Sequence, residues 1–240
     1  MKYVCDFDVN SHDIDVCGNL RASAVLRYMQ EAANLQLYTT GYSYDNMRKD
    51  GKVYILGRLN LSVYGAVHAH DKLTAETWLY ECRGATFNRA HRLYCHGVLA
   101  AEAITVWALV GVLDKKIYRV TDIDTSQHTD TDTVGIDAPA RLNLRDMPLS
   151  LCGEREVYYA DCDGNGHMNN TVYPDMLFSF TPEAKQKTGG RVVSLNISFQ
   201  NEAPLGEVLK IYTAGSDDAR YFRTVRSDGK TNVEAEMVIE

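Results

Sequence analysis

Apolar and polar residues alternate along two stretches of the chain in the way that predicts β-strands. In residues 55–63, Leu59, Leu61 and Val63 are apolar and the residues between them are polar, and residues 193–199 repeat this pattern. Because successive side chains of a strand point to opposite faces, a period of two indicates a sheet with one buried face. Further strands are predicted at about 72–82, 88–99 and 101–113, and at about 207–214, 219–227 and 231–239.

Two other stretches carry apolar residues at helical spacing, one before each set of strands. The first stripe is Val25, Tyr28, Met29, Ala32, Ala33 and Leu35, and the second is Val172, Tyr173, Met176, Leu177 and Phe180. We therefore predict one long helix in each half. After the second helix, Thr181-Pro182-Glu183 is typical of a helix start, so a further short helix should follow and end at Gly189-Gly190.

The same elements occur twice because the sequence repeats weakly. Residues 13–20 resemble residues 161–168, 148 positions later, and residues 59–63 resemble residues 195–199, 136 positions later. Such a long period indicates duplication of a whole domain. We expect an α+β protein with an N-terminal unit at 1–120, a linker rich in Asp, Thr and Pro at 121–150, and a C-terminal unit at 151–240. Each unit should be an antiparallel sheet wrapped around its helix.

Composition narrows the class of protein. The net charge is −7, which disfavours nucleic-acid binding. No apolar run reaches the roughly 20 residues that span a bilayer, and the first residues lack the features of a secretory signal, so we expect a cytoplasmic protein. The six cysteines form no CxxC pair, and no Cys/His cluster has zinc-site spacing. Reduced thiols, with no metal and no cofactor, are the expectation.

The segment from Tyr159 to Tyr173 is dense in functional groups where a predicted strand turns into a helix. Asp163, Asn165 and His167 lie two residues apart, so an extended turn could place them on one side. A helix N-terminus presents free backbone N–H groups that suit a developing oxyanion. The candidate donors are the amides of Gly166, Met168 and Asn169, and Asn169 or Asn170 is a candidate helix cap.

Three interpretations of this segment compete. A calcium loop would use Asp161, Asp163, Asn165 and Gly166 at its positions 1, 3, 5 and 6, but its twelfth residue is Val172 instead of Glu. A purely structural role would have the polar groups shape a turn and cap the helix. The third interpretation is catalysis.

The motif Asp163-x-Asn165-x-His167-x-Asn169-Asn170-x-x-Tyr173 resembles that of hotdog-fold thioesterases. The whole chain resembles the acyl-acyl carrier protein thioesterases of bacterial type, which hydrolyse fatty acyl thioesters on a double-hotdog fold. Residues 197–203 resemble the family segment that carries a catalytic glutamate, which is Glu202 here. Plant members have a cysteine after this glutamate, whereas this chain has Ala203, so a cysteine cannot be required at that position.

The resemblance implies catalytic roles for Asp163, Asn165, His167 and Glu202. We expect Glu202 or His167 to take a proton from water and Asn165 to orient the water or the thioester. Asp163 should hold His167 or Asn165 in place, or orient the backbone around them. The first half has Cys17, Asn19 and Ala66 at the positions of Asn165, His167 and Glu202, so it should be catalytically silent. By resemblance it would house the acyl chain, with Trp107 as a substrate-binding residue.

The implied partner is an acyl carrier protein that bears a fatty acyl group. Because carrier and enzyme are both acidic, docking should need a basic patch. The candidates are Arg83, Arg89, Arg92, Arg220, Arg223 and Arg226. An acyl-CoA thioesterase and a non-catalytic lipid-binding protein of the same fold are the alternatives. Two hotdog units in one chain can pair with each other, so the protein should be a monomer or a homodimer.

Overall fold

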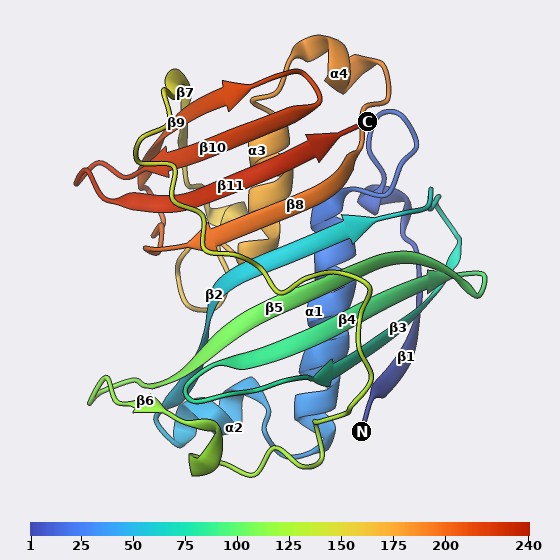
Figure 1. The fold of residues 1–240 in the computed structure, drawn as a ribbon, viewed down its shortest axis with the longest axis vertical. Helices are drawn as coiled ribbons and strands as arrows, with labels where there is room; N and C mark the ends of the chain where they lie inside the picture. Colours follow the sequence, from blue (N-terminus) through green and yellow to red (C-terminus); the bar gives the residue numbers. More distant parts are fainter.

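One continuous antiparallel sheet carries the fold of residues 1–240 in this computed structural model (Figure 1). Its strand order is β1-β3-β4-β5-β2-β8-β11-β10-β9-β7, and the short β6 pairs with β5. The first half contributes β1 (Tyr3–Asp8), β2 (Lys52–Val63), β3 (Lys72–Leu79), β4 (Phe87–Cys95), β5 (Val98–Gly111) and β6 (Ile117–Tyr118). The second half contributes β7 (Ser150–Glu156), β8 (Val192–Phe199), β9 (Val208–Gly215), β10 (Ala219–Val225) and β11 (Thr231–Ile239). This is the α+β, double-hotdog arrangement that the sequence predicts.

All the strands predicted from alternation are present, but the turn between β4 and β5 lies earlier than expected. It consists of His96 and Gly97, whereas the alternation predicted a turn near residue 100. Both residues have positive φ, 50° and 78°, as a tight two-residue hairpin turn requires. The apolar run that follows therefore begins at Val98 and pairs directly with Cys95.

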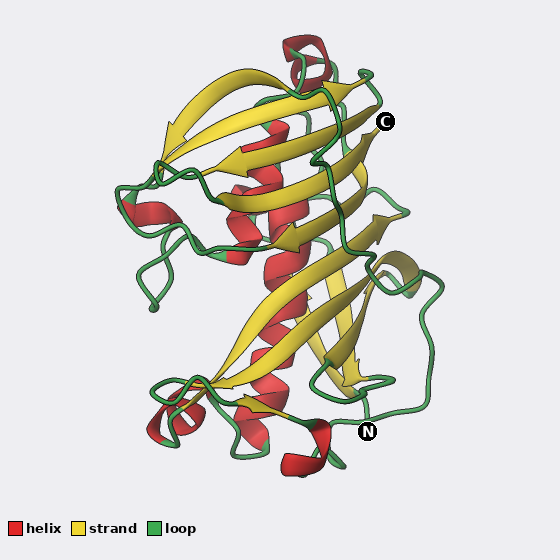
Figure 2. Ribbon diagram, turned by 60° about the vertical axis from the view of Figure 1, so that its left-hand side comes forward, coloured by secondary structure: helices red, strands yellow, loops and turns green.

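The helices lie together on one face of the sheet (Figure 2). They are α1 (Ala22–Thr39), α2 (Tyr44–Lys49), α3 (Tyr173–Phe178) and α4 (Glu183–Lys187). The first stripe is buried as predicted except at its end, where Gln36 is buried and Leu35 is only half-buried.

The prediction of one long helix in the second half is wrong. There α3 has six residues, preceded by a 3-10 turn at Asn170–Val172 that Asn169 caps through its side chain. The Thr181 hydroxyl donates to the carbonyl of Phe178 and thereby satisfies a group at the end of α3. The predicted short helix follows as α4, with Pro182 at its N-cap position instead of its first turn.

The two halves meet where β2 pairs antiparallel with β8. Leu59 lies opposite Ile197, Asn60 opposite Asn196 and Leu61 opposite Leu195. Asn60 and Asn196 are also equivalent residues of the sequence repeat, 136 positions apart. A pairing in which equivalent residues face each other has the geometry of a two-fold interface between identical units. The hydrophobic core is correspondingly continuous, with one cluster of 33 buried residues that draws on both halves.

A belt of buried polar side chains interrupts the core of the first half. It separates the large cluster from a small one formed by Met47, Phe87 and Leu109. Its members are Gln36, Thr77, Arg89, His91 and Thr105. Arg89 donates to Gln36 at 2.6 Å and to Thr77 at 3.2 Å, and no carboxylate pairs with it. Burial accordingly lowers the pKa of Arg89 to about 10.

The segment after β6 crosses the sheet on the face opposite the helices (Figure 1). Two buried glutamates hold it there through backbone N–H groups. Glu102 accepts from Gly135 at 3.1 Å, and Glu234 accepts from Leu144 at 3.2 Å. Glu102 pairs with Ser62 of β2, and Glu234 pairs with Ser198 of β8, the counterpart of Ser62 in the repeat, so the same device fixes the connection on each half.

No helix of the structure is both long and apolar enough to cross a membrane.

The burial of His91 predicts how the stability of the fold depends on pH. Burial lowers the pKa of His91 to about 3, below its ordinary value of 6.5. As the pH falls below 6.5, the unfolded chain binds a proton that native His91 does not, so the native state loses stability. Urea unfolding at pH 7 and pH 5 should show a loss on the order of 1–2 kcal/mol from this group. His91→Gln should reduce the loss, and His12→Gln, at an exposed position, should not.

Candidate active site

The structure brings the 163–167 turn and the end of β8 together. His167 Nε2 lies 3.7 Å from Glu202 Oε1. Two backbone hydrogen bonds hold the segments side by side, from Met168 N to Ala203 O at 2.8 Å and from Leu205 N to Gly166 O at 3.2 Å. The His167 side chain is 23% exposed and that of Glu202 is 66% exposed, so the pair faces solvent at its carboxylate. The arrangement can bind and polarise a water molecule.

Asp163 shapes the turn. Its Oδ1 accepts from the backbone N–H of Asn165 at 2.8 Å, and its own N–H donates to the carbonyl of His167 at 3.1 Å. Gly166 has φ 78°, a conformation that glycine adopts without strain. Of the alternatives predicted for Asp163, the contacts in the structure fit the one in which this residue orients the backbone of the turn.

Asn165 is held by the first half of the molecule, which the sequence analysis did not anticipate. Arg48 Nη1 lies 3.0 Å from Tyr44 Oη and can only donate, so the Tyr44 oxygen accepts this bond. The Tyr44 hydroxyl hydrogen then goes to Asn165 Oδ1, with which it forms a short hydrogen bond. The Asn165 amide NH₂ is thereby left as a donor for a ligand. No local motif marks Tyr44, because its partner lies 121 residues away.

Hydrogen bonds from polar side chains hold the backbone at the end of β8, directly before Glu202. Asn232 Nδ2 donates to Tyr173 Oη at 3.0 Å and also to the carbonyl of Asn201. Arg226 Nη1 donates to the carbonyl of Glu202 itself at 3.0 Å. Burial raises the pKa of Tyr173 to about 12, so its hydroxyl stays protonated. Tyr173 is the last residue of the motif, and this network gives it a positioning role.

The predicted oxyanion donors are engaged elsewhere. The N–H of Gly166 donates to Asp163 O at 3.0 Å, that of Met168 to Ala203 O, and that of Asn169 to Asp161 O at 2.9 Å. These bonds form the turn and its contact with the end of β8. For these three amides the prediction is therefore corrected. The main-chain N–H of His167, which donates to no other group, and the Asn165 side-chain amide are available as donors.

The calcium-loop interpretation does not fit the structure. The Asp161 carboxylate, its first ligand, binds Arg155 at 2.7 Å and the Tyr158 N–H at 2.9 Å. The segment before it is the strand β7, whereas an EF-hand needs a helix there. Burial, together with the carboxylates of Asp161 and Asp163, raises the pKa of the Cys162 thiol, as expected for a cysteine that is not a nucleophile.

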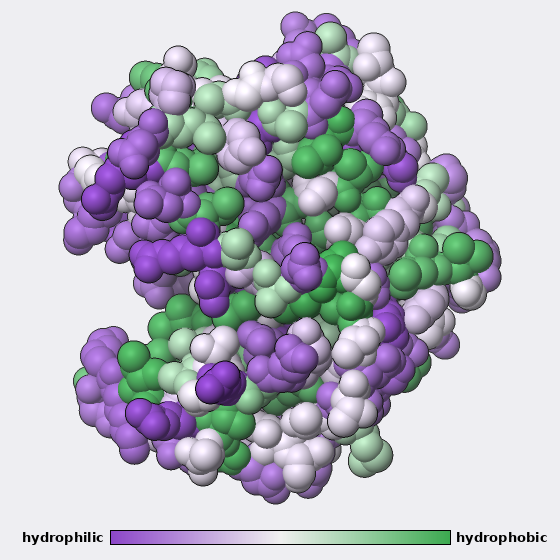
Figure 3. Space-filling model, in the orientation of Figure 1, coloured by the Kyte–Doolittle hydropathy of each residue, from purple (hydrophilic) through white to green (hydrophobic).

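Trp107 lies in the small apolar cluster under α2. It packs against Met47, Phe87 and Leu109, and its Nε1 donates to Thr105 Oγ1 at 2.8 Å. Met47 is three residues from Tyr44 on the same helix, so α2 connects this cluster to the 163–167 turn. In Figure 3 the surface is indented between the two halves at the left, and apolar side chains gather there.

Two cavities lie near the parts of the first half that correspond to the candidate site of the second. An apolar one of about 20 Å³, which is room for about one water, lies beside Asn19, Ala66 and Val67, the first-half counterparts of His167, Glu202 and Ala203. A polar, open cavity of about 420 Å³ lies between residues 10–13 of the first half and Asn169 of the second. Neither is an apolar channel of the length that a fatty chain needs.

The basic patch predicted for docking is not present as such. Arg89 is buried, and four of the other candidates are in ion pairs. These pairs are Arg92 with Glu102 at 3.1 Å, Arg220 with Asp217 at 3.5 Å, Arg223 with Glu234 at 2.9 Å, and Arg226 with Glu207 at 3.4 Å. Only Arg83 remains exposed without an acidic partner.

Comparison with known proteins identifies the family. The family model of the acyl-ACP thioesterase N-terminal domain matches residues 1–126, and that of the C-terminal domain matches residues 150–238. The chain belongs to the acyl-ACP thioesterase family. It is therefore a thioester hydrolase, and the hydrolysis of acyl-ACP thioesters is the reaction of its family.

Solved structures of similar fold cover the whole chain. An acyl-ACP thioesterase from Bacteroides thetaiotaomicron has a TM-score of 0.90 at 16% identity and is covered to 98%. A 12:0-ACP thioesterase from Umbellularia californica has a TM-score of 0.81 at 17% identity and is covered to 97%. Both comparisons include 100% of this chain, and at these identities they show the fold. No curated protein sequence matches the chain.

The link from α2 to Asn165 predicts a role for Tyr44 in positioning. Tyr44→Phe removes the hydroxyl that holds the Asn165 amide and should lower kcat/KM about tenfold, the effect of losing one hydrogen bond of ordinary net strength. Steady-state hydrolysis of an acyl thioester measures it. Tyr38→Phe, in which an exposed hydroxyl is removed at the end of α1, is the matched control. Equal activity of the two variants would show that Tyr44 has no such role.

Proposed function

We propose that Glu202 and His167 activate the water that hydrolyses the acyl thioester, with Asn165 as the electrophilic partner. The observation that carries this proposal is the 3.7 Å approach of His167 Nε2 to Glu202 Oε1, in the same turn as the Asn165 side chain that Tyr44 orients. Glu202 is the more exposed of the pair, so it is the group that water reaches. We assign it the role of general base, and His167 that of its polarising neighbour.

The reaction proceeds by addition and elimination. Water attacks the thioester carbonyl carbon while Glu202 accepts a proton from it, and the carbonyl oxygen becomes an oxyanion. The Asn165 NH₂ donates a hydrogen bond to this oxygen. When the tetrahedral intermediate collapses, the C–S bond breaks, the carrier leaves as a thiol with the proton from the base, and the fatty acid is released. Asp163, Tyr44 and the Tyr173–Asn232 network keep the participating groups in place.

The first half lacks this chemistry but supplies binding surface. Its turn has Asn19 where the second half has His167, and Ala66 where the second half has Glu202. We infer that the first half is catalytically silent and that the acyl chain enters beneath α2, toward Trp107. The polar belt at Arg89 then marks the far end of the apolar cluster, which favours short or medium acyl chains over long ones.

Acyl carrier protein is the proposed carrier because both matching family models describe acyl-ACP thioesterases. The similar structure from Umbellularia is that of a 12:0-ACP thioesterase, and a medium-chain substrate agrees with an apolar cluster of only three buried residues. Since β2 and β8 already join two hotdog units, a monomer suffices for the fold, and a homodimer stays a prediction. A cytoplasmic location also stays a prediction.

Catalytic-site variants test the chemistry. His167→Ala and Glu202→Gln should each lower kcat by roughly 10²–10⁴, the usual contribution of general acid–base groups. Asn19→Ala, the counterpart of His167 in the first half, should retain wild-type kcat. Circular dichroism and thermal unfolding establish that each variant is folded. Wild-type turnover in His167→Ala would remove His167 from the mechanism.

Matched substrates test the carrier. The wild-type enzyme should give a higher kcat/KM with acyl-ACP than with acyl-CoA carrying the same chain, and a 12-carbon chain should exceed an 18-carbon chain. A preference for acyl-CoA would favour the alternative thioesterase. Binding of fatty acid without turnover of either thioester would favour a lipid-binding protein.

A further inference from the structure

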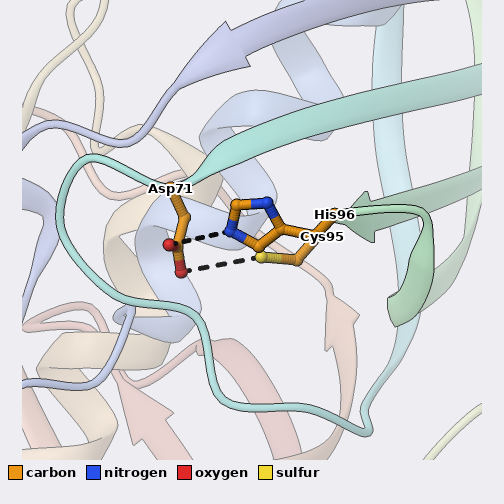
Figure 4. Close-up of side chains that lie close together, drawn as sticks. All are labelled: Asp71, Cys95 and His96. Atoms are coloured by element: carbon orange, nitrogen blue, oxygen red, sulfur yellow. Dashed lines mark hydrogen bonds and ion pairs between the residues drawn. The ribbon is translucent and has the colours of Figure 1, made fainter.

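We propose that Asp71, Cys95 and His96 form a transition-metal site of the zinc type at one end of the first-half sheet. The residues come from two neighbouring turns, the one before β3 and the one between β4 and β5. Figure 4 shows the Asp71 carboxylate directed at both the His96 ring and the Cys95 sulfur. The nitrogen, oxygen and sulfur donor atoms all lie within 4.8 Å of one another.

The spacing of these atoms suits tetrahedral coordination. His96 Nε2 lies 3.0 Å from Asp71 Oδ1, and Cys95 Sγ lies 3.6 Å from Asp71 Oδ2. Zinc bonds of roughly 2.0–2.3 Å at tetrahedral angles put neighbouring ligand atoms about 3.3–3.6 Å apart. The separations of 3.0 and 3.6 Å lie near this range, but each involves a different oxygen of Asp71, so the carboxylate would turn to offer one oxygen to the ion.

The donor set selects the class of ion. A thiolate, an imidazole and one carboxylate are ligands that zinc and its substitute cobalt accept, whereas magnesium and calcium require oxygen ligands. Coordination replaces the thiol proton of Cys95, which is released to solvent. Three protein ligands leave one position of a tetrahedral site for water.

His96 stands at a position of the turn that other residues usually occupy. In a two-residue hairpin turn whose residues both have positive φ, the first position favours Asn, Asp or Gly. Here His96 occupies it with φ 50°, and His70, in the facing turn, has φ 72°. Such conformations cost energy for a residue with a side chain. A ligand bond from the imidazole would offset that cost and would fasten the β4–β5 turn to the turn before β3.

The site is separate from the catalytic turn. Phe87, at the start of β4, packs against Met47 of α2, the helix that contacts Asn165. Cys95 lies at the other end of the same strand, eight residues on. At about 3.3 Å per residue, Cys95 lies roughly 25 Å along the strand from Phe87. The metal would thus act on the stability of the first half and not on the reacting atoms.

Metal titration of the purified, chelator-treated enzyme tests the proposal. One cobalt ion per chain should bind and produce thiolate-to-cobalt charge-transfer absorption, which zinc abolishes by displacement. Zinc should also raise the Tm of the wild-type protein. In Cys95→Ser the charge-transfer absorption should disappear. Zinc affinity in this variant should fall by more than the roughly 10–100-fold that is typical of outer-shell partners.

Two further variants keep the backbone intact while removing a ligand. His96→Asn places a residue suited to positive φ at the turn, and Asp71→Asn retains an acceptor for the His68 N–H, which Asp71 binds at 2.8 Å. Both should weaken zinc binding. Cys82→Ser and His167→Ala, which alter a cysteine and a histidine outside the cluster, should bind metal as the wild type does. Absence of cobalt absorption in the wild type, or its persistence in Cys95→Ser, would overturn the proposal.

Discussion

The pairing of β2 with β8 determines how every other part of the molecule is placed. Because Asn60 faces its own counterpart Asn196, the two units are related as the subunits of a symmetric dimer would be, and their sheets merge into one. The helices of both units consequently lie on the same face, where α1 packs against α3. This arrangement carries α2 of the first half to the 163–167 turn of the second, so the candidate site contains residues of both halves.

The two copies have kept the same local structure while their chemistry has diverged. In each copy an aspartate carboxylate organises the turn, as Asp15 does for Cys17 and Asp163 for Asn165, and a glycine at its end has positive φ. What the first copy lacks is the histidine and the glutamate. It has instead a long helix and a buried arginine without a carboxylate partner. This pattern is what we expect if the first copy lost the hydrolytic residues and came to bind the substrate instead.

Sequence patterns were sufficient for the strands, for α1 and for the meeting of His167 with Glu202, because each depends on local periodicity or on a family motif. They failed where the outcome depends on distant neighbours. The second helix is short because polar groups end it after Phe178, which its apolar stripe does not encode. Tyr44 and the cluster around Asp71 were not predicted because their partners are separated in sequence, by 121 residues in the case of Tyr44 and Asn165. The oxyanion prediction failed for the amides of Gly166, Met168 and Asn169 because each donates to a nearby backbone carbonyl.

The connection between the halves runs over the outer face and is held at Glu102 and Glu234 by one backbone amide each. Everything else that joins the halves, namely the strand pairing, the helix contact and the shared core, is independent of it. A single cleavage between these two anchor points would therefore leave two fragments that stay associated. The protein is in this sense a heterodimer of its own halves, suited to assembly from separately synthesised pieces.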